Sequence, residues 1–146
     1  MTEAMQAKEK PELVFADLMP GRKFRALEYP ITRELIQYFM AVVGDHHPLY
    51  THGDPATALA PPGLAAIYAR ASYLQDHTMP SGGVLAKQEF EFITPAKIGD
   101  TLTVSARVTE SLQDEKGRKR VTFLIKAVNQ RGQAVCEVTL GAIWPK

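Results

Sequence analysis

The sequence has a single cysteine and no excess of charge of either sign. Cys136 cannot close an internal disulfide, and its apolar neighbours predict a buried position in a strand rather than a reactive surface thiol. Such cysteine usage is typical of a reducing, cytoplasmic setting. The 17 Lys and Arg residues nearly balance 16 Asp and Glu residues, which leaves a net charge of +1. Without a field of one sign to hold a phosphate backbone, nucleic acid is not an expected partner.

Long hydrophobic runs are absent as well. No run of about 18 apolar residues occurs, and the first 12 residues, MTEAMQAKEKPE, are polar and charged, so neither a membrane span nor a signal peptide is expected. Residues 1–12 are predicted to be a frayed terminus. A chain of 146 residues with 45% hydrophobic residues can bury one core. Because no repeat or linker follows, residues 13–146 are predicted to form a single domain.

Two helices are predicted in the first half of the chain. Thr32 is a suitable N-cap for a helix that continues to about Val43, where Gly44 supplies the expected stop. A second helix is expected from Gly63 to about Gln75. Its apolar residues occupy nearly all sides, so it should be surrounded by protein.

The residues after the second helix alternate with a period of two, which is typical of half-buried strands. Strands are predicted at 87–93, 101–109, 119–129 and 133–144, after a short early strand at 23–29. The connections DEKGRK and NQRG are typical of hairpin turns, so the sheet should be antiparallel with one wet face. A buried helix followed by such a sheet predicts an α+β fold in which the sheet wraps the helix.

The segment between the two helices, residues 45–61, has no periodic pattern and carries most of the chemically versatile side chains. Three of the four histidines lie here beside acidic and phenolic groups; the set is Asp45, His46, His47, Tyr50, His52 and Asp54. Their spacing matches none of the ligand pairs of structural zinc, so no metal site is expected. Each of the three histidines remains open as a catalytic group or as a solvated loop residue.

Two stretches in and after this segment resemble one known family. GDHHPLY at 44–50, followed by APPGL at 60–64, resembles the MaoC-like hot-dog dehydratases, most closely their N-terminal-type, FAS1-like dehydratase branch. FADLMPGRKF at 15–24, EFEF at 89–92 and IGDTL at 98–102 support the resemblance in the same order. It covers most of the chain and implies a hot-dog fold, an antiparallel sheet wrapped around one long central helix.

The resemblance also implies an activity and its partners. Active members of the family hydrate trans-2-enoyl thioesters or dehydrate (R)-3-hydroxyacyl thioesters, which are carried on CoA or on acyl carrier protein. They act as dimers or pseudo-dimers, so a homodimer or a heterodimer with a second hot-dog subunit is implied. No cofactor, metal ion or membrane is implied.

The family's motif is an aspartate, four residues and a histidine, followed by a glycine that opens the central helix. On this sequence the resemblance makes Asp45, Tyr50 and Gly63 the candidate catalytic residues, with the tyrosine at the histidine position. Similar chains with this tyrosine occur as subunits beside a partner that supplies the acid/base pair. His47 stands where the family usually has an asparagine. The candidate substrate-binding residues are His47, Pro62 and Leu64.

Hydration of a conjugated thioester needs a donor for the negative charge that grows on the thioester oxygen and a base that takes a proton from water. The backbone N–H of Gly63 or Leu64 is the candidate donor, because unpaired amides and the helix dipole favour an oxyanion at a helix start. A free tyrosine side chain, with a pKa of ~10, is ionised in about one molecule in a thousand at neutral pH. Tyr50 is therefore a poor substitute for an imidazole base, and we expect weak or no hydratase activity from the isolated chain.

These assignments have alternatives. Asp45 is also suited to capping the loop after a glycine-terminated helix, and Gly63 to a plain turn after two prolines. The charged run 115–120 is expected to be a solvated hairpin tip, or alternatively a contact for CoA phosphates or a carrier protein. Two other functions stay open: an acyl-thioester-binding subunit without chemistry, and a hot-dog thioesterase, which would need a carboxylate near the central helix.

Overall fold

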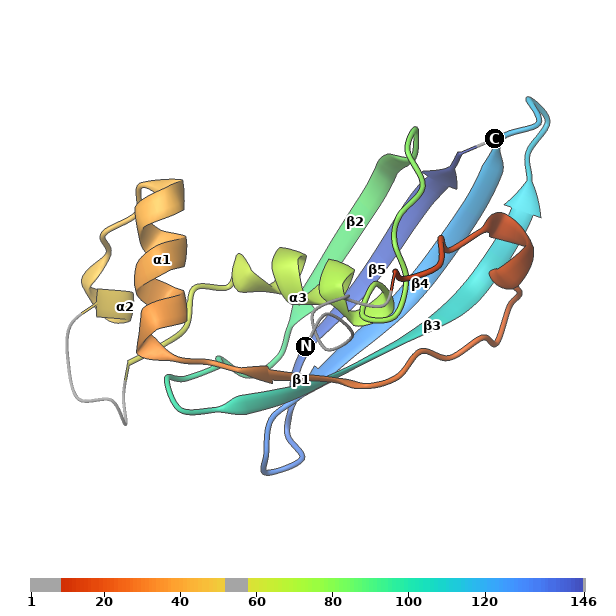
Figure 1. Ribbon diagram of the computed structural model, residues 1–146. Helices are drawn as coiled ribbons and strands as arrows, with labels where there is room; N and C mark the ends of the chain where they lie inside the picture. Colours follow the sequence, from red (N-terminus) through yellow and green to blue (C-terminus); the bar gives the residue numbers. More distant parts are fainter. Residues whose placement is uncertain (1–8, 52–57, 146) are drawn as a thin grey trace, which may run out of the picture.

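The computed structural model describes residues 9–51 and 58–145, and its main feature is a five-stranded antiparallel sheet (Figure 1). The strand order is β1-β3-β4-β5-β2. The bounds are β1 (Leu27–Pro30), β2 (Val84–Phe92), β3 (Thr101–Gln113), β4 (Lys119–Val128) and β5 (Ala134–Trp144). All neighbouring strands pair antiparallel. The four long predicted strands are thus confirmed, although β2 begins earlier and β3 ends later than their sequence patterns suggest.

The two predicted hairpins join β3 to β4 and β4 to β5. In the first turn the N–H of Asp114 donates to the carbonyl of Arg118 at 2.9 Å, and in the second the N–H of Asn129 donates to the carbonyl of Gln133 at 3.0 Å. Each turn contains a glycine with positive φ, which is the conformation that such turns require. Short connections of this kind make β3, β4 and β5 spatial neighbours.

In the described part of the chain, four helical segments accompany the sheet: the 3-10 turn η1 (Phe15–Asp17), α1 (Arg33–Val43), α2 (Pro48–Thr51) and α3 (Leu64–Tyr73). The Oγ1 atom of Thr32 accepts a 3.1 Å hydrogen bond from the N–H of Leu35, and Gly44 ends α1 with a φ of 72°. Both predicted ends of α1 are therefore confirmed, whereas the short helix α2 was not predicted. No helix of the described residues is long and apolar enough to cross a membrane.

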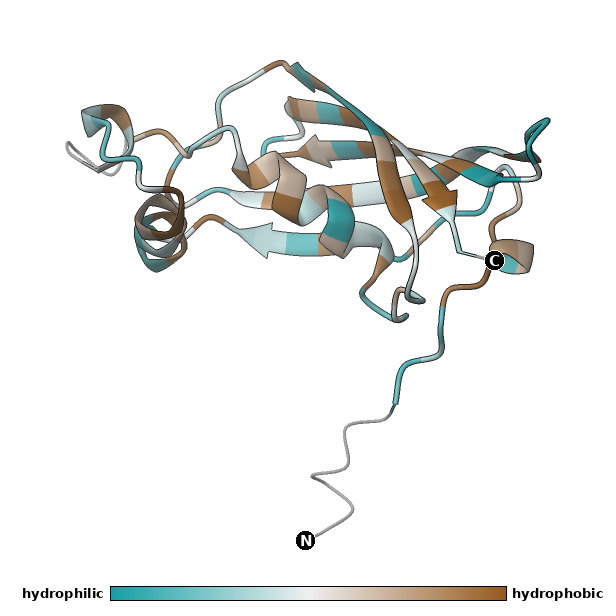
Figure 2. Ribbon diagram, turned by 90° about the horizontal axis from the view of Figure 1, so that it is seen from above, coloured by the Kyte–Doolittle hydropathy of each residue, from teal (hydrophilic) through white to brown (hydrophobic). Residues whose placement is uncertain are grey.

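The sheet curves around α3, while α1 and α2 stand at one end of the molecule (Figure 1). Buried residues alternate with more exposed ones along β3, β4 and β5, and the buried set belongs to the same core as the buried residues of α3. Figure 2 shows the hydropathy alternating along the strands. Phe123, Ile125 and Val138 are fully buried in this layer, and Cys136 is buried as predicted. The fold is α+β, with the hot-dog arrangement of a sheet around a central helix.

The early part of the chain pairs less regularly than its pattern predicts. Of the strand predicted at 23–29, only residues 27–29 belong to a continuous strand, which is β1. Lys23 forms an isolated bridge to Arg107. Nearer the N-terminus, the carbonyl of Pro11 accepts a 2.9 Å hydrogen bond from the N–H of Thr78, so the paired part of the chain already includes residues 11 and 12.

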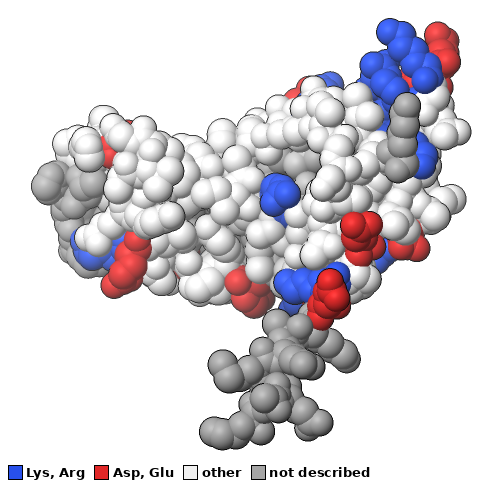
Figure 3. Space-filling view, turned by 45° about the horizontal axis from the view of Figure 1, so that its top comes forward, with Lys and Arg blue, Asp and Glu red and all other residues white. Residues whose placement is uncertain are grey.

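One face of the central helix is not covered by this chain. Ile67 on α3 is 47% exposed, and Phe92 on the edge strand β2 is 56% exposed. The reason is that a single sheet covers only one side of the helix, and β2 has a neighbour on one side only. Figure 3 shows the resulting broad surface, which carries few charged side chains between the two ends of the molecule.

Candidate functional site

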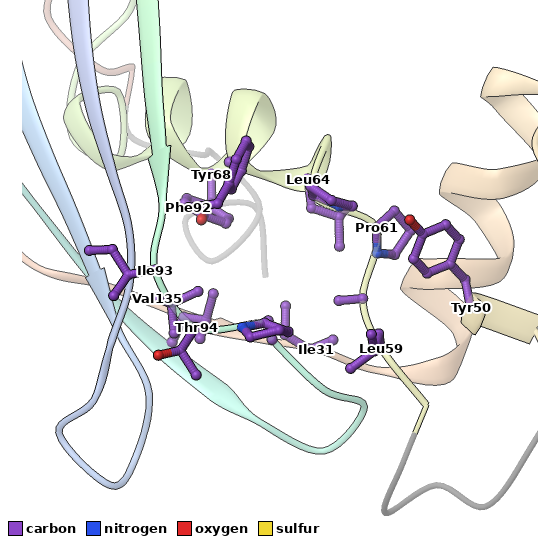
Figure 4. A pocket seen from close by; sticks show the side chains of 16 residues that line it. Ile31, Tyr50, Leu59, Pro61, Leu64, Tyr68, Phe92, Ile93, Thr94 and Val135 are labelled. Atoms are coloured by element: carbon purple, nitrogen blue, oxygen red, sulfur yellow. The ribbon is translucent and has the colours of Figure 1, made fainter.

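An apolar cavity of about 250 Å³ lies beside the first turn of α3 (Figure 4). Its walls come from α2 and the segment before α3, from α3 itself, from the end of β2 and the residues after it, from the chain between β1 and α1, and from single residues of β3 and β5. Representative lining residues are Ile31, Leu59, Leu64, Phe92, Ile93 and Val135. Small-molecule sites usually measure about 300–1,000 Å³, so this cavity is suited to a short or medium aliphatic group.

Local backbone pairing fixes the rim of the cavity. The N–H of Ala60 donates to the carbonyl of Ala96 at 2.7 Å, which holds the segment before α3 against the segment after β2. The N–H of Leu59 donates to the carbonyl of Leu49 at 3.1 Å, and this bond brings α2 to the same rim. Tyr50, the next residue of α2, is thereby placed in the cavity wall, where it is partly buried.

Three of the six predicted site residues line the cavity and three do not. Tyr50, Pro62 and Leu64 are in its wall. Gly63 lies between two lining residues but contributes no side chain, whereas Asp45 and His47 are exposed outside the wall. The predicted stretch thus lies beside one cavity, and the helix and loop geometry decides which of its side chains line that cavity.

Asp45 and His47 are linked to Tyr50 through the loop. The Oδ1 atom of Asp45 accepts a 3.0 Å hydrogen bond from the N–H of His47, and the Nδ1 atom of His47 accepts a 3.2 Å hydrogen bond from the N–H of Leu49. The ring centroids of His47 and Tyr50 are 5.8 Å apart. Asp45 therefore performs the loop-capping role that the sequence offered as an alternative, and this cap shapes the turn that leads into α2.

The start of α3 distinguishes between the two candidate oxyanion donors. The N–H of Leu64 donates to the carbonyl of Pro61 at 3.2 Å and is therefore engaged. The N–H of Gly63 forms no hydrogen bond with any other described residue. The two residues before it, Pro61 and Pro62, have no N–H, so Gly63 offers the first amide donor at this helix start.

A buried phenol outside the six predicted site residues also lines the cavity. Tyr68 is 4% exposed, lines the cavity, and has its ring 5.5 Å from the ring of Tyr29. Burial raises the pKa of both hydroxyls, and it raises the pKa of the Cys136 thiol next to Tyr68. These groups are therefore neutral at physiological pH. The helical spacing of Tyr68 four residues after Leu64 is the signal that could have placed it here.

No charged side chain lines the cavity among the residues that the structure describes. His46 is exposed in the loop, while His52 and Asp54 lie outside the described residues. Within the described ranges, no three His, Cys, Asp or Glu side chains gather in a way that could hold a metal ion. The cavity as described can bind an aliphatic group and donate hydrogen bonds at its rim, but it offers no strong base.

Comparison with known proteins identifies the family. The model of the "FAS1-like, dehydratase domain region" family matches residues 18–138, which is most of the chain. This chain belongs to the FAS1-like dehydratase family. A UPF0336 protein of Streptomyces avermitilis is 30% identical over 131 residues, an alignment that covers 79% of this chain and 85% of that protein.

Solved structures place this FAS1-like dehydratase chain among the MaoC-like hot-dog proteins. The R-hydratase PhaJ1 of Pseudomonas aeruginosa is 26% identical, with a TM-score of 0.73 over 92% of this chain and 87% of that one. The HadBC complex of Mycobacterium tuberculosis, a 3R-hydroxyacyl-ACP dehydratase, contains a chain that is 22% identical, with a TM-score of 0.72 over 85% of this chain and 96% of that one. The second likeness shows the shared fold.

The charged run 115–120 of the FAS1-like dehydratase chain lies at the tip of the β3–β4 hairpin, at the end of the sheet away from α1 (Figure 1). Its two arginines are engaged there: the Nε atoms of Arg118 and Arg120 lie 2.7 and 2.8 Å from the Oδ2 atom of Asp114. The hydrogen bond from Arg120, followed by those from Arg118, holds the pKa of the Asp114 carboxyl well below its usual range. This arrangement favours the solvated-tip interpretation over a role in substrate binding.

Proposed function

We propose that this chain is an acyl-thioester-binding subunit of a MaoC-like (R)-specific enoyl hydratase or 3-hydroxyacyl thioester dehydratase. The observation that carries the proposal is the apolar cavity whose rim holds Tyr50 and the start of α3. Transfer of each methylene group from water into such a cavity is favourable by about 0.8 kcal/mol. An acyl chain therefore fits the walls, and its polar thioester is directed to the rim, where donors are present.

The rim is suited to orienting the thioester carbonyl. The N–H of Gly63 forms no hydrogen bond with described residues and lies at the positive end of the α3 dipole. The Tyr50 hydroxyl, which lies near Pro61 in the cavity wall, is a second donor (Figure 4). Together these two groups would stabilise negative charge on the thioester oxygen without acting as a base.

The acid/base pair is proposed to come from a partner chain. Tyr50 occupies the family's histidine position, and the Asp45 carboxylate is engaged in capping its own loop. A second hot-dog subunit with the intact motif of aspartate, four residues and histidine would complete the site. The likeness to a chain of the two-protein HadBC complex supports such a pairing.

The open face of the protomer gives this partner a place to bind. Phe90 and Phe92 on the edge strand β2 are 36% and 56% exposed, and Ile67 on α3 is 47% exposed. Pairing of a second sheet with β2 would continue the hydrogen-bond ladder and remove an unprotected edge. It would also cover apolar surface that is costly to leave in water.

Binding of hexanoyl-CoA to the purified chain, measured by isothermal titration calorimetry, tests the first part of the proposal. Ala65 is 1% exposed and lines the cavity, so Ala65→Leu should fill part of it and weaken binding by about tenfold or more. Ala66→Leu, one residue later on the exposed side of α3, is the matched control. If a folded Ala65→Leu variant binds hexanoyl-CoA as tightly as the wild type, the cavity is not the acyl site.

Crotonyl-CoA hydration tests the second part. The chain alone should hydrate it no faster than buffer, and activity should appear on co-purification with a hot-dog chain encoded beside it that carries the intact motif. If the chain alone hydrates crotonyl-CoA and the Asp45→Asn variant loses this activity, the chain is instead a self-sufficient hydratase. Release of free CoA thiol would indicate a thioesterase, for which no carboxylate of the described residues lines the cavity.

A further inference from the structure

A second, polar hollow adjoins the acyl cavity. Thr94 and Pro95 line both, so the two are neighbours across the short segment that follows β2. In Figure 4 Thr94 marks the border of the apolar cavity on this side. The polar hollow also includes Lys97, Asp100, Gln130 and Arg131, from the turn before β3 and the turn between β4 and β5.

Lys97 is held at the rim of the acyl cavity by backbone pairing. It forms an antiparallel bridge with Leu59, and Leu59 lines the apolar cavity next to Tyr50. The Lys97 residue is exposed, and its ammonium group forms no ion pair with any residue in the described ranges. An exposed cation thus lies beside Leu59, in the wall of the apolar cavity.

Arg131 adds a second cation from a turn of fixed shape. The buried side chain of Asn129 accepts hydrogen bonds at its Oδ1 atom from the N–H groups of Arg131 and Gln133, both at 3.0 Å. The Arg131 side chain is 53% exposed, with its Nε 3.3 Å from the Oε1 atom of Gln133 and one terminal nitrogen 3.7 Å from the Oδ1 atom of Asp100. Arg131 lines the hollow, and a guanidinium has five N–H donors, more than these two contacts use.

Asp100 connects the turn before β3 with the turn between β4 and β5. Its single negative charge offsets only one of the two positive charges of Lys97 and Arg131. It is 4% exposed, its Oδ2 atom accepts from the N–H of Lys97 at 2.9 Å, and its Oδ1 atom accepts from the side-chain nitrogen of Gln130 at 2.8 Å. Gln130 in turn accepts from the N–H of Thr101 at 3.1 Å. The carboxylate is thus satisfied inside the framework, and the hollow presents two exposed cations with a net positive charge.

We propose that Lys97 and Arg131 bind the phosphate of the phosphopantetheine arm, which CoA and acyl-carrier-protein thioesters share. The inference rests on the proposed function, because the acyl group must occupy the adjoining cavity for the arm to cross Thr94 and Pro95. Arginine and lysine are the side chains that recognise phosphate, through charge-assisted hydrogen bonds. The site would anchor the carrier through the group common to both carriers, ahead of any contact with the nucleotide or the carrier protein.

The test compares ligands that differ in the phosphate. Hexanoyl-pantetheine, hexanoyl-phosphopantetheine, hexanoyl-CoA and hexanoylated acyl carrier protein are titrated against the wild-type chain and the Lys97→Gln/Arg131→Gln variant by calorimetry. The wild type should prefer phosphopantetheine to pantetheine by about tenfold, and the variant should lose most of that preference while its affinity for hexanoyl-pantetheine is unchanged. The same loss for CoA and for the carrier protein is expected, because both present this phosphate.

Lys116→Gln/Lys126→Gln removes the same charge at exposed positions away from the hollow and should keep the preference. Equal wild-type affinity for pantetheine and phosphopantetheine, or a preference that survives in the Lys97→Gln/Arg131→Gln variant, would overturn the inference. A preference for CoA alone would overturn it in favour of nucleotide recognition. If none of the acyl ligands binds, the proposed function itself is wrong and this inference is overturned with it.

Discussion

A Cβ atom at Gly63 would lie 2.9 Å from the Cζ atom of Phe39, so the aromatic ring on α1 closes directly over the first turn of α3. The backbone of Gly63 is ordinary and helical, with a φ of −61°. Glycine is therefore required here for space and not for backbone conformation. The same residue whose N–H is proposed to meet the thioester oxygen also allows α1 to pack against the central helix.

Gly63→Ala should lower the free energy of unfolding by about 1–2 kcal/mol, because the added methyl group forces the Phe39 ring to move. Phe39→Leu removes the ring atoms that the new methyl group would meet. The Gly63→Ala/Phe39→Leu double variant should therefore lose less unfolding free energy than the two single variants lose together. Urea unfolding followed by circular dichroism measures all four proteins. Strict additivity would show that the ring does not constrain this glycine.

Tyr50→His should give the isolated chain measurable hydratase activity, at least about tenfold above the wild type, because it places an imidazole in the cavity wall. The gain should disappear when Asp45→Ala is added, because the Oδ1 atom of Asp45 caps the turn that leads into α2 and so positions residue 50. Tyr38→His on the 73% exposed outer side of α1 is the control, since it adds the same group away from the cavity. Crotonyl-CoA hydration is the assay, and a well-folded Tyr50→His variant without activity would argue against a substrate position beside residue 50.

The sequence predicted best the elements whose signals are local. Thr32 and Gly44 mark the ends of α1 because a side-chain cap and a positive φ are properties of single residues. The hairpins at DEKGRK and NQRG were equally readable from their turn residues. The candidate site stretch was found through its resemblance to a family, and Tyr50, Pro62 and Leu64 do line one cavity.

The features of the site that the sequence did not predict depend on contacts between segments that are distant in the chain. The adjacency of Lys97 to the cavity rim arises from its bridge to Leu59, which no local pattern encodes. The engagement of the Leu64 N–H by Pro61 depends on how tightly the first turn of α3 closes. The exposure of Ile67 within this chain could not be read from the sequence, because an apolar pattern shows that a surface must be covered without showing whether the same chain covers it.

Asp114 should make the stability of the β3–β4 hairpin depend on pH in the acidic range. Its lowered pKa means that the ionised carboxyl stabilises the folded chain fully above the unfolded pKa of about 3.9, and that this contribution is lost as the pH falls through the folded value. Asp114→Asn should therefore lower Tm at pH 7, and its difference from the wild type should shrink steadily below a pH of about 4. Glu115→Gln, which removes the neighbouring carboxylate, is the control in the same thermal scans. A difference that stays constant with pH would show that Asp114 acts through packing and not through its charge.

Ile67→Lys should weaken assembly of the chain with itself or with its partner while leaving the protomer folded. The side chain is 47% exposed in the protomer, so a lysine can extend into water there, whereas in an assembly that covers α3 it would bury a charge without a partner. Met19→Lys is the matched control, because Met19 is 64% exposed and lies on neither α3 nor β2. Light scattering coupled to size-exclusion chromatography should show a lower mass for Ile67→Lys than for the wild type and no change for Met19→Lys. An unchanged mass for a folded Ile67→Lys variant, alone and with the partner, would place the interface away from the open face of the central helix.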